Sequence, residues 1–225
     1  MEERFNHDFV TWHHKTPVGI KVDEIFGMDS KSGKVWIELA RQIYAEQGEP
    51  NYRVIGHFPN GAPFLEGYAG RISITHTSHF FAVASLPKTP EINLELLNPR
   101  TAMGIDAEAF DRSQVLKVRT KFLSEKELSF IQEEDIISNI IAWTSKEALY
   151  KAALTPGIDF KNAIQIKSLP QISSADNTYS LGEAVIILPD SAELERMEMK
   201  LYSYSSYNCC VTLAFSPKCA KFGSH

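Results

Sequence analysis

The sequence has few cysteines and no long apolar run, and both absences restrict the class of protein. Three cysteines occur among 225 residues, at positions 209, 210 and 219. An odd number, with two of them adjacent, does not build a disulfide framework. Cys209 and Cys210 stand in an apolar run, so we predict buried, reduced thiols in a strand and a cytoplasmic location. No apolar stretch is long enough to span a bilayer, and the first residues lack the apolar core of a signal peptide, so we expect no membrane association.

Other patterns are missing as well. The net charge of −5 argues against general binding of nucleic acid. His76 and His79 have no cysteine or third histidine at ligand spacing, which excludes a zinc site. His13 and His14 lie near a polar end and are expected to be solvated. No internal repeat or low-complexity segment is present, and we expect a monomer.

Periodic patterns predict an α+β fold in two lobes. Each lobe is expected to pack helices on a mainly antiparallel sheet, with the boundary in the connector at 87–99, giving lobes 1–100 and 101–225. Ser124 and Glu127 form a capping-box pattern, and Ile137, Ile141, Ala148 and Ala152 form one apolar stripe. Helices are predicted at 34–46, 113–123 and 136–154, and strands at 71–75, 80–85, 103–107, 164–166, 184–188, 197–204 and 210–215.

Three carboxylates and a lysine are the strongest candidates for chemistry. Asp106 and Glu108 are two residues apart on a predicted strand, so they project to one face. Glu147 and Lys151 are one helical turn apart. Taken alone, Asp106 and Glu108 would also fit a solvated strand edge. Glu147 and Lys151 alone would also fit a surface pair that stabilises the helix. Together, they suit Mg²⁺, with Mn²⁺ as an alternative, and a substrate that carries phosphate.

His76 is a further candidate. It continues the phase of Ile72 and Ile74, which favours a histidine in the core. Its place at a strand end, beside the hydroxyls of Thr75 and Thr77, would also let it donate hydrogen bonds to a phosphate. The sequence leaves both interpretations open.

Several segments occur in the order that one enzyme family uses. Gly104-Ile-Asp-Ala-Glu108 and Trp143-Thr-Ser-Lys-Glu-Ala-Leu-Tyr-Lys151 resemble that family's Gly-Val/Ile-Asp-Ile-Glu strand and Trp-x-x-Lys-Glu-Ala-x-x-Lys helix. Asn60-Gly-Ala-Pro-Phe-Leu65 resembles its Gly-Lys-Pro loop, Ile72-Ser-Ile-Thr-His-Thr77 its Ile-Ser-His-Ser strand end, and Lys121-Phe-Leu-Ser-Glu125 its Arg-Phe-Phe-Ser segment. The chain thus resembles a 4′-phosphopantetheinyl transferase of the surfactin-synthetase-activating (Sfp) type.

The resemblance implies a pseudo-dimer of two similar lobes with coenzyme A between them. The 4′-phosphopantetheine arm of coenzyme A would move to a serine of an apo acyl or peptidyl carrier protein, releasing adenosine 3′,5′-bisphosphate. By matching positions, Asp106, Glu108 and Glu147 would hold Mg²⁺, and Glu147 and Lys151 would be catalytic. Thr75, His76, Asp106 and Lys151 would contact coenzyme A.

The chain departs from the family pattern at the first loop, where Ala62 stands in place of a lysine. Lys31 and Lys34 are the candidates for the 3′-phosphate. The departure motivates an alternative, a degenerate relative that binds coenzyme A or a carrier without transfer. A metal-dependent nuclease is a third interpretation. Such nucleases commonly place the glutamate and the lysine two residues apart on a strand, whereas here the two residues are one helical turn apart. Because carrier proteins are usually acidic, Arg112, Lys117 and Lys121 are predicted to form the docking surface, with a solvated helix face as the alternative.

Overall fold

The computed structural model describes residues 3–6, 9–16, 20–28, 31–46, 55–66, 68, 70–87, 102–172, 180–188 and 195–217. The chain divides into two compact units, one of Met1–Asn98 with Ala220–His225 and one of Pro99–Cys219. The predicted boundary at residue 100 stays a prediction, because residues 88–101 lie outside the described part of the chain.

The first unit contains an antiparallel sheet with strand order β1-β2-β3-β7-β6. β6 and β7 form the predicted hairpin, in which His76 pairs with Phe81. A two-stranded pair, β4 and β5, and one helix complete the described elements of this unit. Their bounds are β1 Glu3–Asn6, β2 Phe9–Lys15, β3 Lys21–Gly27, α1 Gly33–Glu46, β4 Ile55–His57, β5 Pro63–Leu65, β6 Gly70–His76 and β7 Phe80–Pro87.

Helix α1 covers one face of this sheet and confirms the amphipathic pattern at 34–46. Trp36 and Ala40 are fully buried against Ile25, Phe81 and Val83. The Trp36 indole also donates a hydrogen bond to the carbonyl of Thr77 at 3.0 Å. The helix is thus fixed to the turn that joins β6 and β7.

The three N-terminal strands were not predicted from the sequence. Asp23 and Glu24 are adjacent and both buried in β3, which breaks the alternation of apolar and polar residues that identifies a strand. His13 and His14 are both half-buried, so they are less solvated than expected. His13 Nδ1 lies 2.5 Å from Oδ1 of buried Asp23, and burial lowers the pKa of His14 below its usual value.

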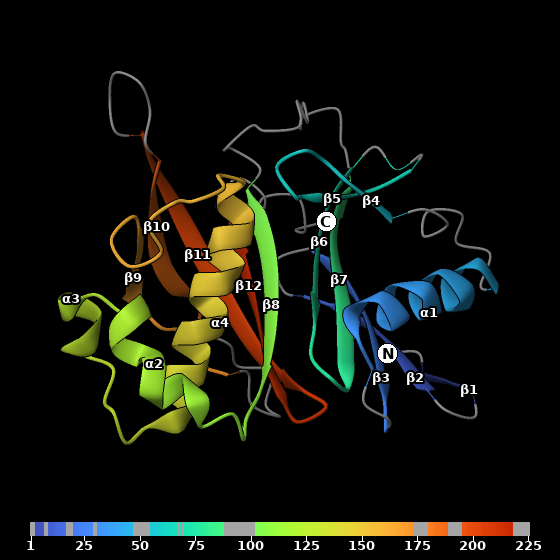
Figure 1. Cartoon of the computed structure of the whole chain (residues 1–225), viewed down its shortest axis with the longest axis horizontal. Helices are drawn as coiled ribbons and strands as arrows, with labels where there is room; N and C mark the ends of the chain where they lie inside the picture. The colour runs from blue at the N-terminus through green and yellow to red at the C-terminus, as the bar shows by residue number, and fades with distance from the viewer. Residues whose placement is uncertain are drawn as a thin grey trace. The chain divides into compact units, whose positions relative to one another are not determined.

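The second unit contains another antiparallel sheet, with strand order β8-β12-β11-β10-β9. The five strands confirm the strand predictions for this half of the chain. In Figure 1 helix α4 lies along β8 and β12, with α2 and α3 nearby. Their bounds are β8 Met103–Ala109, α2 Gln114–Phe122, α3 Glu125–Leu128, α4 Ile136–Ala153, β9 Ile164–Ser168, β10 Gly182–Leu188, β11 Glu195–Ser206 and β12 Cys209–Phe215.

The helix ends in this unit follow local sequence signals. The predicted capping box is present at the start of α3, where Ser124 Oγ accepts from the backbone N–H of Glu127. Asp135 caps α4 by accepting from the N–H of Ser138 at 3.0 Å. Leu154 ends α4 in a left-handed conformation. These caps fix where α4 starts and stops, and hence which residues it presents to β8.

The structure confirms an α+β fold with antiparallel sheets and packed helices. The similarity of the two lobes stays a prediction. Ile137 was wrongly placed in the apolar stripe of α4, since it is 40% exposed and Ile136 packs on the core in that turn. Cys209 and Cys210 are buried free thiols in β12, as predicted. No helix in the described ranges combines the length and apolarity that crossing a membrane requires.

Candidate active site

Strand β8 directs Asp106 and Glu108 to the face of the sheet that α4 covers. Asp106 pairs with Thr212 of β12, and Glu108 pairs with Cys210. Paired residues share a face of a sheet. Thr144 of α4 lies 2.7 Å from the Thr212 hydroxyl, so this is the α4 face. Both carboxylates are therefore buried beneath the helix, with exposed fractions of 8% and 5%.

Helix α4 supplies the complementary cation. Lys151 Nζ lies 2.7 Å from Asp106 Oδ1 and donates to the carbonyl of Ile105 at 3.0 Å. The ammonium is therefore held by both the side chain and the backbone of β8. The pairing of Asp106 with Lys151 joins two motifs that are 45 residues apart in the sequence.

A glycine allows β8 and α4 to approach closely. A Cβ atom placed on Gly104 would lie 2.0 Å from the carbonyl oxygen of Ala148 and 2.8 Å from the amide nitrogen of Ala152. Both atoms belong to the backbone of α4, which flanks Lys151. Gly104 faces α4 on the same side of the sheet as Asp106, because it pairs with Ala214 in the same register. The glycine of the Gly-Ile-Asp-Ala-Glu segment thus sets the distance across which Lys151 reaches Asp106.

The other two carboxylates share this electrostatic environment. Glu108 forms an ion pair with Arg112, which lies four residues later. Burial raises the pKa of Glu147, and the negative charges of Asp106 and Glu108 raise it further, while Lys151 opposes the shift. Burial likewise raises the pKa of Glu108, and Arg112 counteracts part of the effect. Three carboxylates therefore interact at one place, with Lys151 and Arg112 offsetting their charge.

These residues suit a hard divalent cation by their chemistry, although they are not arranged as a preformed cage. In the described part of the chain, no group of three or more His, Cys, Asp or Glu side chains is arranged to hold a metal ion. Asp106 and Glu108 face cationic side chains instead. The donor set itself consists of oxygen ligands, the type that Mg²⁺ prefers. The predicted triad of metal ligands stays a prediction.

The candidates in the first unit lie on two different faces of β6. Thr75 is buried and His76 is exposed, as expected for neighbours on a strand. Of the two interpretations of His76, its exposure contradicts the core histidine. A Cβ on Gly33 would lie 2.5 Å from His76 Nε2, so the imidazole rests on the first residue of α1. Their predicted contacts with coenzyme A stay predictions.

The basic residues assigned to the 3′-phosphate flank the start of α1. Lys31 Nζ lies 6.0 Å from the ring centroid of Trp36, and Lys34 is exposed. In the first loop, the Ala62 amide donates to the side chain of Asn60 at 3.1 Å. Ala62 therefore contributes to a local turn, and its side chain carries no charge.

Trp143 packs on the aromatic side chains beside α4. Its ring centroid lies 5.0 Å from that of Phe122 and 6.1 Å from that of Phe160. Tyr150, on the same helix, also contacts Phe160 at 5.8 Å. These contacts hold Trp143 in an aromatic cluster on this side of α4.

Sequence reasoning missed two features of the site. Arg112 was assigned to the docking surface, yet it pairs with Glu108. Lys146 received no role, although it is fully buried in an ion pair with Glu127. A signal existed for Lys146, because it stands one turn from Ala142 and Leu149, which are both buried. A lysine in such a stripe indicates a buried partner.

The comparisons with known proteins place the second unit in a family. Residues 102–211 match the family model described as ACPS, the 4′-phosphopantetheinyl transferase superfamily. No curated protein matches the chain. The matched segment includes β8, α4 and every residue of the carboxylate and lysine cluster. Residues 102–211 form a domain of the 4′-phosphopantetheinyl transferase superfamily.

Proposed function

We propose that this protein is an enzyme that transfers the 4′-phosphopantetheine arm of coenzyme A to a serine of an apo acyl or peptidyl carrier protein. A superfamily domain implies phosphopantetheine transfer to carrier proteins. The serine acceptor, the dependence on Mg²⁺ and the membership in the Sfp type belong to the proposal. Each unit also holds a five-stranded antiparallel sheet with a helix packed on it, which supports the pseudo-dimer.

One observation carries the proposal: Lys151 of α4 reaches Asp106 of β8 at 2.7 Å, beside two further carboxylates. The reaction displaces a pyrophosphate oxygen, and negative charge develops on the leaving group. A lysine whose present partner is an ion can exchange that partner for a phosphate oxygen. Such positioned charges stabilise a developing negative charge strongly in a partly buried site.

Glu147 is suited to accept the proton of the incoming serine. Burial and neighbouring carboxylates raise its pKa, so this pKa lies closer to neutral pH than that of an ordinary glutamate. In the transfer, the serine Oγ bonds to the phosphorus that carries the pantetheine arm. The bond from this phosphorus to the bridging oxygen breaks, and adenosine 3′,5′-bisphosphate leaves with the electron pair. The serine proton passes to Glu147.

Asp106, Glu108 and Glu147 would hold the divalent cation. When bound, Mg²⁺ supplies charge neutralisation for the pyrophosphate and for the carboxylates around it. One oxygen of each carboxylate is already engaged, Glu108 Oε2 by Arg112 and Asp106 Oδ1 by Lys151, so these two basic side chains compete with a divalent cation for the carboxylates. The affinity for Mg²⁺ is therefore expected to rise when Arg112 is replaced by glutamine.

The experiment incubates the protein with coenzyme A, Mg²⁺ and a panel of apo acyl and peptidyl carriers, and measures intact carrier mass. A gain of one phosphopantetheine group is expected. Glu147→Ala should abolish the gain, while Glu134→Ala, which removes an exposed glutamate just before α4, should not. Coenzyme A binding without any mass gain across the panel would favour the degenerate relative that Ala62 suggests.

A further inference from the structure

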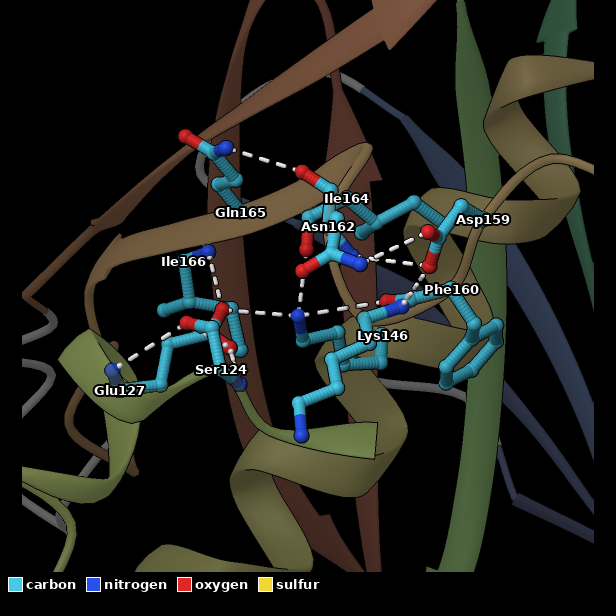
Figure 2. A network of polar contacts seen from close by, with 10 residues as sticks. Ser124, Glu127, Lys146, Asp159, Phe160, Asn162, Ile164, Gln165 and Ile166 are labelled. Atoms are coloured by element: carbon cyan, nitrogen blue, oxygen red, sulfur yellow. Dashed lines mark hydrogen bonds and ion pairs between the residues drawn. The ribbon is translucent and has the colours of Figure 1, made fainter. Parts of the chain in front are cut away.

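Lys146 and Glu127 form an ion pair that is closed to solvent. Their side chains are 0% and 1% exposed, and Lys146 Nζ lies 2.8 Å from Glu127 Oε1. The ammonium also donates to the backbone carbonyls of Ile164 and Phe160 (Figure 2). Three acceptors surround the three protons of the lysine, so its hydrogen-bonding capacity is met.

The carboxylate of Glu127 is equally occupied. One of its oxygens accepts from the backbone N–H and the hydroxyl of Ser124, at 2.7 and 2.9 Å. The other accepts from the backbone N–H of Ile166 at 2.7 Å as well as from Lys146. The pair therefore links the N-terminus of α3, the start of β9 and the middle of α4.

Stability alone does not account for such a pair. Replacing a buried ion pair with apolar residues of similar volume is often neutral or stabilising, because both ions lose their hydration. Burial lowers the pKa of Lys146, and the charge of Glu127 opposes that effect. What the pair adds over an apolar contact is direction, because each charged atom has a fixed set of backbone partners.

The direction matters because Lys146 immediately precedes Glu147 on α4. Neighbouring residues on a helix point about 100° apart, so fixing the lysine fixes the rotation of the helix and the bearing of the next side chain. The same ammonium holds the carbonyl of Phe160, whose ring packs on Trp143, one turn before Glu147. The ion pair thereby holds α4 at two points near Glu147, at Lys146 directly and at Trp143 through Phe160.

We propose that the Lys146–Glu127 ion pair is a positioning element that sets the orientation of Glu147. The inference rests on the proposed function, because one of its tests measures kcat for phosphopantetheine transfer. Neither residue touches the reacting atoms, so both are positioning residues. The variants Lys146→Met, Glu127→Gln and the combined Glu127→Gln/Lys146→Met separate positioning from stability.

In Lys146→Met a buried carboxylate loses its counter-charge, and the melting midpoint should fall markedly. The combined variant removes that charge while keeping the shape of residue 127, so the midpoint should recover relative to Lys146→Met. Its kcat should nevertheless stay reduced by about 10²-fold, the effect of misplacing a reacting group by about 1 Å. KM for coenzyme A should change much less, because the lost interaction acts on the transition state. Assays run well below every melting midpoint.

Thr144→Val is the matched control, since it breaks another buried polar contact between α4 and the sheet, the 2.7 Å link to Thr212. It should lower the midpoint and leave kcat near the wild-type value. The positioning role is overturned if the combined variant regains kcat together with its midpoint, or if Lys146→Met keeps wild-type kcat.

A second readout does not depend on transfer. Hydrogen exchange should accelerate in segment 159–166 and in the C-terminal half of α4 in both Lys146 variants, but not in Thr144→Val. If the wild-type protein modifies no carrier, the proposed function fails, and exchange alone decides the positioning role. Unchanged exchange in the combined variant would overturn it.

Discussion

Replacing Gly104 with alanine is the most direct test of how the site is built. Gly104 lies where β8 passes the backbone of α4, and an added Cβ would stand 2.0 Å from the carbonyl oxygen of Ala148. Real Cβ contacts essentially never fall below 3.0 Å, so the strand and the helix must separate by about 1 Å. The neighbour is helix backbone, which cannot rotate away as a side chain can.

The separation has two consequences of different size. Overpacking of this kind costs about 1–3 kcal/mol. A loss of about 2 kcal/mol lowers the Tm of a chain of this length by about 4–8 °C. The same movement stretches the 2.7 Å contact between Lys151 and Asp106, two residues along β8. A misplacement of about 1 Å costs about 10²-fold in rate, so transfer should fall far more than stability.

The assay compares Gly104→Ala with Gly157→Ala by thermal unfolding and by carrier mass. Gly157 has φ +77° and no atom within 4 Å of an added Cβ. Alanine there costs about 1–2 kcal/mol through backbone strain, with no pressure on α4. Gly157→Ala should keep its transfer rate at a comparable loss of Tm. Equal transfer rates in the two variants would refute the role assigned to the close approach.

Further predictions concern charge and thiol chemistry. The pKa of Glu147 is raised in the folded state, so its ionised form costs stability above the unfolded value of about 4.3. Glu147→Gln should therefore increase the free energy of unfolding at pH 7, measured by urea titration with a chelator present. The increase should disappear near pH 4. A lower free energy of unfolding for the variant at pH 7 would contradict the prediction. Lys117 and Lys121 are exposed on α2, and reversing both to glutamate should raise KM for an acidic carrier and leave Tm unchanged. An unaltered KM would remove α2 from the docking surface. Burial raises the pKa of Cys210 to about 11, so iodoacetamide at pH 8 should label this residue in denaturant but not in the native protein, as peptide mass spectrometry would show.

Much of the second unit could be predicted because its local signals agree with its packing. A few neighbouring residues are enough to predict the capping box at Ser124 and the end of α4 before Gly157, and the structure has both. The first unit was harder to predict, since β3 buries Asp23 and Glu24 side by side. Two adjacent acidic residues predict a solvated segment unless their partners are known, and the pairing of Asp23 with His13 follows only from the register of β2 and β3.

The site shows the same limit. The i, i+4 spacing predicted that Glu147 and Lys151 share a face, and the i, i+2 spacing predicted the same for Asp106 and Glu108. That α4 crosses β8 at Gly104 follows from the tertiary fold, and no spacing encodes it. The pairing of Glu108 with Arg112 was equally hidden, because an exposed arginine in a turn has many available partners.

The two lysines of the α4 motif illustrate why residue type alone does not assign a role. Lys146 and Lys151 are five residues apart, so they point about 140° away from each other on the helix. Lys146 faces a fully enclosed carboxylate and two carbonyls, whereas the Lys151 side chain is 29% exposed and that of its partner Asp106 is 11% exposed. A methionine at 146 therefore leaves a buried charge unpaired, whereas a methionine at 151 leaves one that water can still reach. Lys146→Met should therefore lower Tm more than Lys151→Met does. Lys151→Met should lower the transfer rate more, relative to its loss of Tm.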